Sequence, residues 1–138
     1  MTTLVERLGN IELFSELTNK EIKKVASYMT TIDVREGRDL TVQGTVGREF
    51  MIIAEGEASV RRNGRLIATL GPGDFFGELA VIAGVPRTAT VTAETKMVVE
   101  ALNRREFSSL LDESPKLSRK ILVGAVKRLH DLEEGVVR

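Results

Sequence analysis

The sequence of 138 residues has no cysteine, no tryptophan and a single histidine, His130. Without cysteine the chain forms no disulfide, has no thiolate nucleophile and offers no thiolate to a metal. The one histidine lies far from the glycine-rich middle of the chain, and no paired carboxylates stand in a motif, so no catalytic set of side chains is visible. We therefore expect a protein that is not an enzyme and binds no metal, with His130 at its surface.

The sequence also lacks an excess of either charge and any long apolar run. Its 20 basic and 20 acidic residues give a net charge of zero, which disfavours nonspecific binding to nucleic acid or to an anionic membrane. No apolar run approaches the roughly 20 residues of a membrane span, and the first residues lack the basic-then-apolar order of a signal peptide. We expect a cytoplasmic protein that does not enter a membrane.

Short apolar segments separated by turns dominate the middle of the chain, residues 31–103, which holds nine of the twelve glycines. Asn63 and Gly64 tolerate the positive φ that a tight hairpin needs. Gly77–Ala83 is too short and alanine-rich for another strand and predicts a single helical turn. Short strands joined by turns indicate an antiparallel barrel or sandwich. The predicted strands are residues 31–34, 50–54, 58–61, 66–70, 89–93 and 97–102.

Helices are predicted on both sides of this segment, which makes the fold class α+β and mainly β. Residues 1–30 contain a capping box that begins at Thr18, with a glutamate three residues later. Residues 104–138 contain a long helix that begins at Pro115 and ends at Gly135. Its predicted apolar stripe, which packs on the rest of the domain or pairs with a second copy, comprises Leu117, Ile121, Leu122, Ala125, Val126, Leu129 and Leu132.

The same helix carries five basic residues. We interpret them as its solvated face, the usual role of such residues on a surface helix, with a small basic docking patch as the alternative. They are Lys116, Arg119, Lys120, Lys127 and Arg128.

The residues most informative about function lie in segment 71–93. A helical turn begins near Gly77, where free N–H groups and the helix dipole can receive an anion. Arg87 follows a proline and presents a planar guanidinium that can hold a phosphate at two points. Glu78 would repel a phosphate but accepts hydrogen bonds from hydroxyls. Together these groups indicate a sugar-phosphate site, although outside such a motif Glu78 and Arg87 would more often form a structural ion pair.

Segment 75–93 resembles the phosphate-binding cassette of the cyclic nucleotide-binding domain family. The family's pattern is roughly Phe-Gly-Glu-Leu-Ala, a short spacer, and Pro-Arg followed by Thr, Ala or Ser and then Ala. The flanking residues match in order and spacing, so the resemblance covers about residues 10–132. The chain is similar to the cyclic nucleotide-binding domains of cAMP receptor proteins and of protein kinase A regulatory subunits. The resemblance implies one domain over residues 1–138, a jelly-roll-like β-roll of about eight antiparallel strands with helices at both ends.

The resemblance also implies roles for individual residues. Glu78 would bind the ribose 2′-hydroxyl, and Arg87 the exocyclic oxygens of the cyclic phosphate. Because a binding arginine needs no partner before ligand arrives, we expect its replacement to leave the ligand-free fold nearly unchanged. Residues 126–130 of the last helix would lie near the base. The rest of the implied site is Gly77, the N–H groups of Leu79, Ala80, Thr88 and Ala89 in the phosphate cradle, and the side chain of Val60 beside the base.

The function implied is that of a regulatory binding module in signal transduction. The ligand would be cAMP, with cGMP as the alternative because the hydroxyl of Thr88 could assist guanine recognition, and no other cofactor is implied. Binding would shift the final helices, and a protein partner or fused effector would respond to that shift. Transcription regulators of the family continue into a helix-turn-helix, but only eight residues follow His130, so we expect no DNA binding.

Three questions stay open at this point. The chain could be a structural or protein-interaction domain of the same fold that does not respond to nucleotide. It could also form a homodimer through its last helix. Finally, Phe75 and Phe76 could stack on a base, although we assign both to the core.

Overall fold

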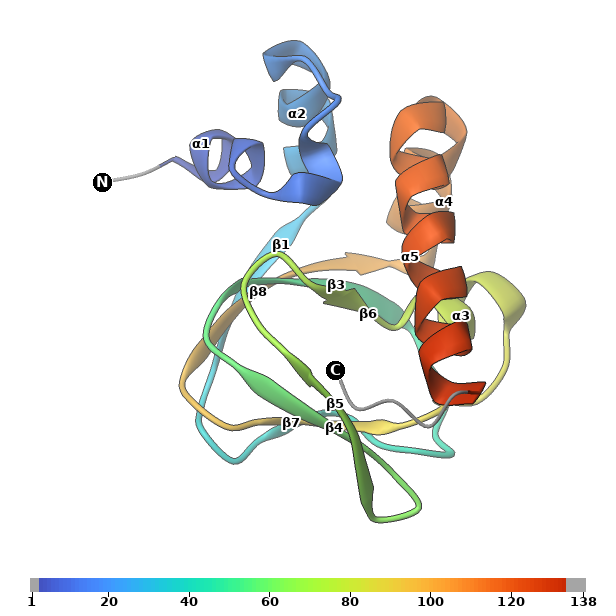
Figure 1. The fold of residues 1–138 in the computed structure, drawn as a ribbon. Helices are drawn as coiled ribbons and strands as arrows, with labels where there is room; N and C mark the ends of the chain where they lie inside the picture. Colours follow the sequence, from blue (N-terminus) through green and yellow to red (C-terminus); the bar gives the residue numbers. More distant parts are fainter. Residues whose placement is uncertain (1–2, 134–138) are drawn as a thin grey trace.

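The structure is a computed structural model that describes residues 3–133, so the helix end predicted at Gly135 lies outside it. Two four-stranded sheets form a roll, and helices from both ends of the chain stand on one side of it (Figure 1). None of the helices in the described residues is long and apolar enough to cross a bilayer. The elements are α1 (Leu4–Gly9), a 3-10 turn η1 (Glu12–Phe14), α2 (Asn19–Ala26), β1 (Thr30–Val34), β2 (Asp39–Thr41), β3 (Glu49–Glu55), β4 (Ala58–Arg62), β5 (Arg65–Leu70), β6 (Phe75–Phe76), α3 (Glu78–Ala83), β7 (Thr90–Ala93), β8 (Met97–Asn103), α4 (Arg104–Glu113) and α5 (Pro115–Glu133).

Both sheets are antiparallel, with strand orders β1-β8-β3-β6 and β2-β7-β4-β5. The β4–β5 hairpin turns at Asn63 and Gly64, whose φ values are 53° and 77°. The predicted hairpin and the α+β, mainly β fold class are therefore confirmed. Sequence patterns missed β2 and β6, because strands of three and two residues are too short to show alternation.

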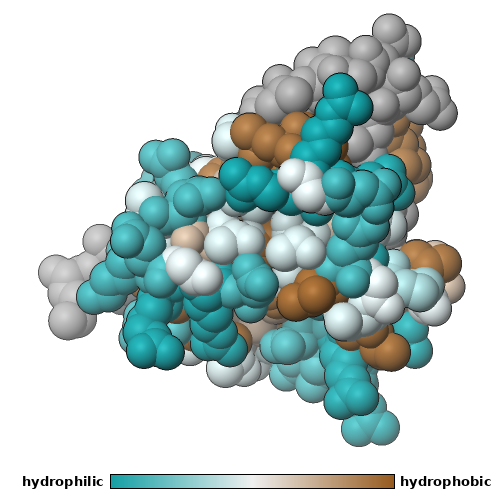
Figure 2. Space-filling model, turned by 90° about the horizontal axis from the view of Figure 1, so that it is seen from below, coloured by the Kyte–Doolittle hydropathy of each residue, from teal (hydrophilic) through white to brown (hydrophobic). Residues whose placement is uncertain are grey.

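The two central strands of the first sheet, β3 and β8, are buried on both faces. Alternate residues of each strand point to opposite sides, so each strand contributes to two layers of the core. On β3, Met51 lies in the roll interior and Phe50 packs against the helices. On β6, Phe76 points into the roll and Phe75 toward the helices, and both are buried as predicted for core residues. The roll face away from the helices is mainly hydrophilic, with only small separate apolar patches (Figure 2).

A buried carboxylate fastens the N-terminal helices to the outer face of the first sheet. Glu100 on β8 has no exposed surface, and one of its oxygens accepts a hydrogen bond from Thr31 Oγ1 at 2.6 Å. Arg7 of α1 lies 3.7 Å from the other oxygen. Since a buried charge is costly without a partner, the pair holds α1 against the sheet.

Lys120 joins α5 to the N-terminal segment. Its Nζ lies 2.9 Å from Glu12 Oε1 and 2.6 Å from Ser15 Oγ. The hydrogen bond with Lys120 lowers the pKa of Glu12, and the same bond raises the pKa of Lys120. The contact therefore stabilises the fold at neutral pH and is lost as pH falls through the lowered pKa of Glu12 or rises through the raised pKa of Lys120. The assignment of Lys120 to a solvated face is wrong.

The apolar stripe predicted for α5 is only partly buried. The helix packs on the domain through a narrower face than predicted, because the residues at the edge of the predicted stripe are exposed to solvent. The side chain of Leu132 lies outside the described part. The buried members are Leu117, Ile121 and Ala125, whereas Leu122, Val126 and Leu129 are 64%, 55% and 45% exposed.

Candidate functional site

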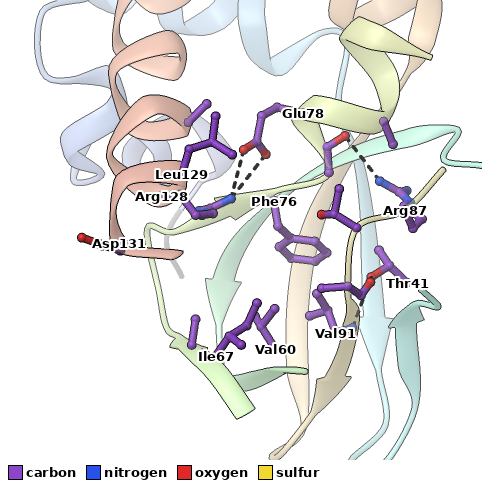
Figure 3. Close-up of a pocket in the computed structure, with 16 residues that line it drawn as sticks. Thr41, Val60, Ile67, Phe76, Glu78, Arg87, Val91, Arg128, Leu129 and Asp131 are labelled. Atoms are coloured by element: carbon purple, nitrogen blue, oxygen red, sulfur yellow. Dashed lines mark hydrogen bonds and ion pairs between the residues drawn. The ribbon is translucent and has the colours of Figure 1, made fainter. Parts of the chain in front are cut away.

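A cavity opens between the roll, α3 and α5. The cavity itself has a volume of about 80 Å³, and its mouth opens to solvent. Glu78 and Arg87 lie on the side of α3, whereas Val60 and Ile67 extend from the second sheet (Figure 3). The cavity therefore has a charged end and an apolar wall.

The charged end is built around Gly77, which precedes α3 with a φ of 93°. A β carbon at this position would lie 2.6 Å from Arg87 Nη1 and 2.7 Å from the carbonyl oxygen of Glu49. Only glycine combines this left-handed conformation with such a close approach. The helical turn predicted here is confirmed, and it brings Glu78 to the cavity.

Arg87 is 8% exposed and already has partners in the protein. Its guanidinium donates to the carbonyl oxygen of Glu49 at 2.9 Å and to that of Gly77 at 3.4 Å. Burial lowers the pKa of Arg87, and the carboxylates of Glu49 and Glu78 act against that shift. The expectation that Arg87 has no partner without ligand is therefore wrong: the arginine also ties the start of α3 to β3.

Glu78 is 2% exposed, and its carboxylate is paired with an arginine of α5. Arg128 Nη1 lies 3.1 Å from Oε1 and 3.4 Å from Oε2 of Glu78 (Figure 3). The other terminal nitrogen of Arg128 donates to the carbonyl oxygen of Phe75, and the guanidinium lies 5.2 Å from the centre of the Phe75 ring. Glu78 thus connects the cavity to the final helix.

The assignment of Arg128 to the solvated face of α5 is also wrong. Its side chain is 22% exposed, and it lines the cavity together with Leu129. Ile121, Ala125 and Arg128 follow one another at steps of four and three residues, which is the spacing of one helix face. This spacing could have indicated that Arg128 lies on the buried face of the helix. Its charge alone predicted exposure, but a long arginine side chain can be buried along most of its length.

Seven of the eight predicted site residues line this one cavity. Leu79 lies beside them in α3, and its side chain is outside the described part. Whether these residues bind a nucleotide stays a prediction. The seven are Val60, Gly77, Glu78, Ala80, Arg87, Thr88 and Ala89.

Sequence patterns missed Thr41, which lines the cavity from β2. Its hydroxyl donates to the carbonyl oxygen of Ala89 at 3.0 Å and accepts from the N–H of Val91 at 3.2 Å. It therefore holds the chain just after Arg87 against the neighbouring strand. No sequence signal marked this threonine, because β2 itself was not recognised.

A family model described as the cyclic nucleotide-binding domain matches residues 31–114. The chain belongs to the cyclic nucleotide-binding domain family. A similar relative is the cAMP-dependent protein kinase regulatory subunit of Yarrowia lipolytica, 38% identical over 106 residues, which are 75% of this chain and 28% of the relative. The chain thus spans about a quarter of the length of that curated relative.

Two solved structures of similar fold are regulatory parts of protein kinase A. The regulatory domain from Toxoplasma gondii, crystallised with cAMP, has a TM-score of 0.77 and 27% identity over 89% of this chain and 48% of its own. The regulatory subunit of a cAMP-independent protein kinase A from Trypanosoma brucei has a TM-score of 0.76 and 28% identity over 86% and 46%. The fold is therefore shared by proteins that differ in their response to cAMP.

Proposed function

We propose that this cyclic nucleotide-binding domain takes up cAMP in the cavity between the roll and α5 and acts as a sensor. The observation that carries the proposal is the convergence of Glu78 and Arg87 at one end of a cavity whose other wall is apolar. An anionic sugar phosphate with a flat base has the matching order of groups. The activity proposed is binding and not catalysis, and a cytoplasmic location stays a prediction.

The charges of the site favour a cyclic phosphodiester over a phosphate monoester. Arg87 and Arg128 are balanced by two carboxylates, that of Glu78, which lines the cavity, and that of Glu49, which acts on Arg87 from outside the lining, so no surplus positive charge awaits a second negative charge. Asp131, the other charged lining residue, lies at the end of α5 away from Arg87 (Figure 3). A cyclic phosphate carries one negative charge, whereas a monoester carries about 1.5 to 2 at neutral pH.

A response to ligand would pass through Glu78. A ribose hydroxyl on this carboxylate would join a group that Arg128 already ties to α5. A nucleotide that binds better to one arrangement of α5 than to another shifts the population toward that arrangement. A protein partner, a fused effector or a second copy would then respond at the exposed outer face of α5, which includes Leu122 and Val126.

Thermal melts with cAMP, cGMP and 5′-AMP test the proposed function. At a concentration about a hundredfold above its dissociation constant, cAMP should add about 2.7 kcal/mol to the free energy of unfolding by mass action. The monoester 5′-AMP should add much less because of its second charge. Unchanged melts with both cyclic nucleotides at millimolar concentration would favour the alternative, a structural or protein-interaction domain of this fold.

Selectivity between the two cyclic nucleotides should depend on Thr88, whose exposed side chain lines the cavity next to Arg87. Its hydroxyl can donate to a guanine placed over the cassette, so Thr88→Ala should weaken cGMP more than cAMP. Competition against a fluorescent cAMP analogue measures both affinities. Equal losses for the two nucleotides would assign Thr88 to phosphate binding or to the fold.

A further inference from the structure

Gly124 lies in the interior of α5, where glycine is among the poorest helix formers. A β carbon at this position would lie 2.6 Å from Cζ and 3.0 Å from Cε2 of the Phe75 ring. Real β carbons essentially never show the first distance, and the second is tighter than nine in ten of their contacts, so an alanine would force either the ring or the helix to move. The missing side chain lets α5 come into direct contact with Phe75.

The Phe75 ring cannot easily give way. It is 8% exposed, and its centre lies 5.6 Å from that of the Phe50 ring, which stacks on Phe107 at 4.3 Å. The far side of this aromatic row is the helical core of the domain. Because close-packed interiors resist added atoms, the helix is the element that would yield.

The position of α5 at Gly124 determines which contacts the helix makes one turn further along, at residues 125–129. Ala125 and Leu129 line the cavity, and Arg128 contacts Glu78, the Phe75 carbonyl and the Phe75 ring. Arg128 is four residues from Gly124, so both lie on one helix face above the same phenylalanine. A helix displaced at Gly124 would carry Arg128 away from Glu78.

We propose that the contact between Gly124 and Phe75 sets the position of α5 over the cavity, which makes Gly124 a positioning residue for nucleotide binding. The inference rests on the proposed function and adds to it the residue that couples helix position to affinity. By linkage, a nucleotide that binds better when α5 is in contact with Phe75 also stabilises α5 in that position.

The test compares Gly124→Ala with Val123→Ala, a neighbouring change on the same helix at a residue that is 45% exposed. Both changes improve helix propensity, so a purely local effect would strengthen the helix in each. We expect Gly124→Ala to weaken cAMP roughly tenfold, about 1.4 kcal/mol, and Val123→Ala to leave the affinity unchanged.

Phe75→Leu supplies the second arm, because a shorter side chain makes room for the added β carbon. In the Phe75→Leu background, Gly124→Ala should cause no further loss of cAMP affinity, so the two changes should be strongly non-additive. The inference is overturned if Gly124→Ala binds cAMP like the wild type, or if the two losses simply add. If the single alanine variant folds poorly, the comparison of Phe75→Leu with the double variant still decides, because a further loss of affinity in the double variant overturns the inference.

Amide hydrogen exchange of the ligand-free proteins separates this inference from the proposed function. Gly124→Ala should speed exchange in residues 124–131 and in the start of α3, whereas Val123→Ala should not. Unchanged exchange would contradict the positioning role. If the wild-type protein binds no cAMP but exchange changes as expected, the proposed function fails. The claim that the contact between Gly124 and Phe75 sets the position of α5 is then still supported.

Discussion

Replacing Arg87 by alanine should weaken cAMP binding by about 2–5 kcal/mol, because the phosphate loses its charge partner in a partly desolvated site. This corresponds to roughly thirty- to several-thousand-fold in the dissociation constant. Arg87→Lys should recover only part of the loss, since an ammonium cannot reproduce the planar two-point contact of a guanidinium. Titration with a fluorescent cAMP analogue measures all three proteins.

The structure adds an effect on the ligand-free protein. Arg87→Ala removes the donor to the carbonyls of Glu49 and Gly77, which should lower the free energy of unfolding by about 1–2 kcal/mol. Arg105→Ala is the matched control, because it removes an equal charge from an exposed position of α4. Wild-type affinity in Arg87→Ala, or a loss of affinity equal to that in Arg105→Ala, would make Arg87 a structural residue only.

Replacing Arg128 by alanine should destabilise the ligand-free domain by about 2–4 kcal/mol, because it leaves the buried Glu78 carboxylate without its cation. The figure is set below that of a fully buried pair because Arg128 is 22% exposed. The affinity for cAMP should fall as well, since the unpaired carboxylate stands beside the phosphate position. Chemical unfolding and nucleotide titration of the same variant measure the two effects.

Lys127→Ala controls for the loss of charge on the same helix, because Lys127 is exposed. The double change of Glu78 and Arg128 to leucine should regain most of the lost stability, as no buried charge then remains. It should not regain cAMP binding, because the hydroxyl acceptor is gone. If Arg128→Ala is no less stable than Lys127→Ala, the ion pair contributes nothing to the fold and α5 is held by other contacts.

The sequence predicted those parts of the fold that depend on local chemistry. Glycine at turns, the Asn63-Gly64 hairpin and the Thr18 capping box each follow from the conformational preference of a few neighbouring residues. The cassette from Gly77 to Ala89 was recognisable because its residues are close in sequence and therefore close in space. Six of the seven predicted residues that line the cavity belong to this segment, whereas Val60 reaches the cavity from β4.

The parts that could not be predicted depend on contacts between distant segments. Arg128 lies 50 residues from Glu78, and Arg7 lies 93 residues from Glu100, so no spacing rule joins either pair. Burial of these charges is decided by tertiary packing, which overrides the usual exposure of arginine and glutamate. Gly124 is similar: its position in the helix is evident from sequence, but only the structure shows the phenylalanine that it admits.

Calorimetric titration of the wild-type domain with cAMP tests most directly whether the cavity is a cyclic nucleotide site. We predict saturable heat with one nucleotide bound per chain, competition by cGMP, and loss of the signal in Arg87→Ala but not in Arg105→Ala. Absence of heat up to millimolar cAMP and cGMP, together with unshifted melts, would contradict the proposed function and leave a domain of this family that does not bind the nucleotide.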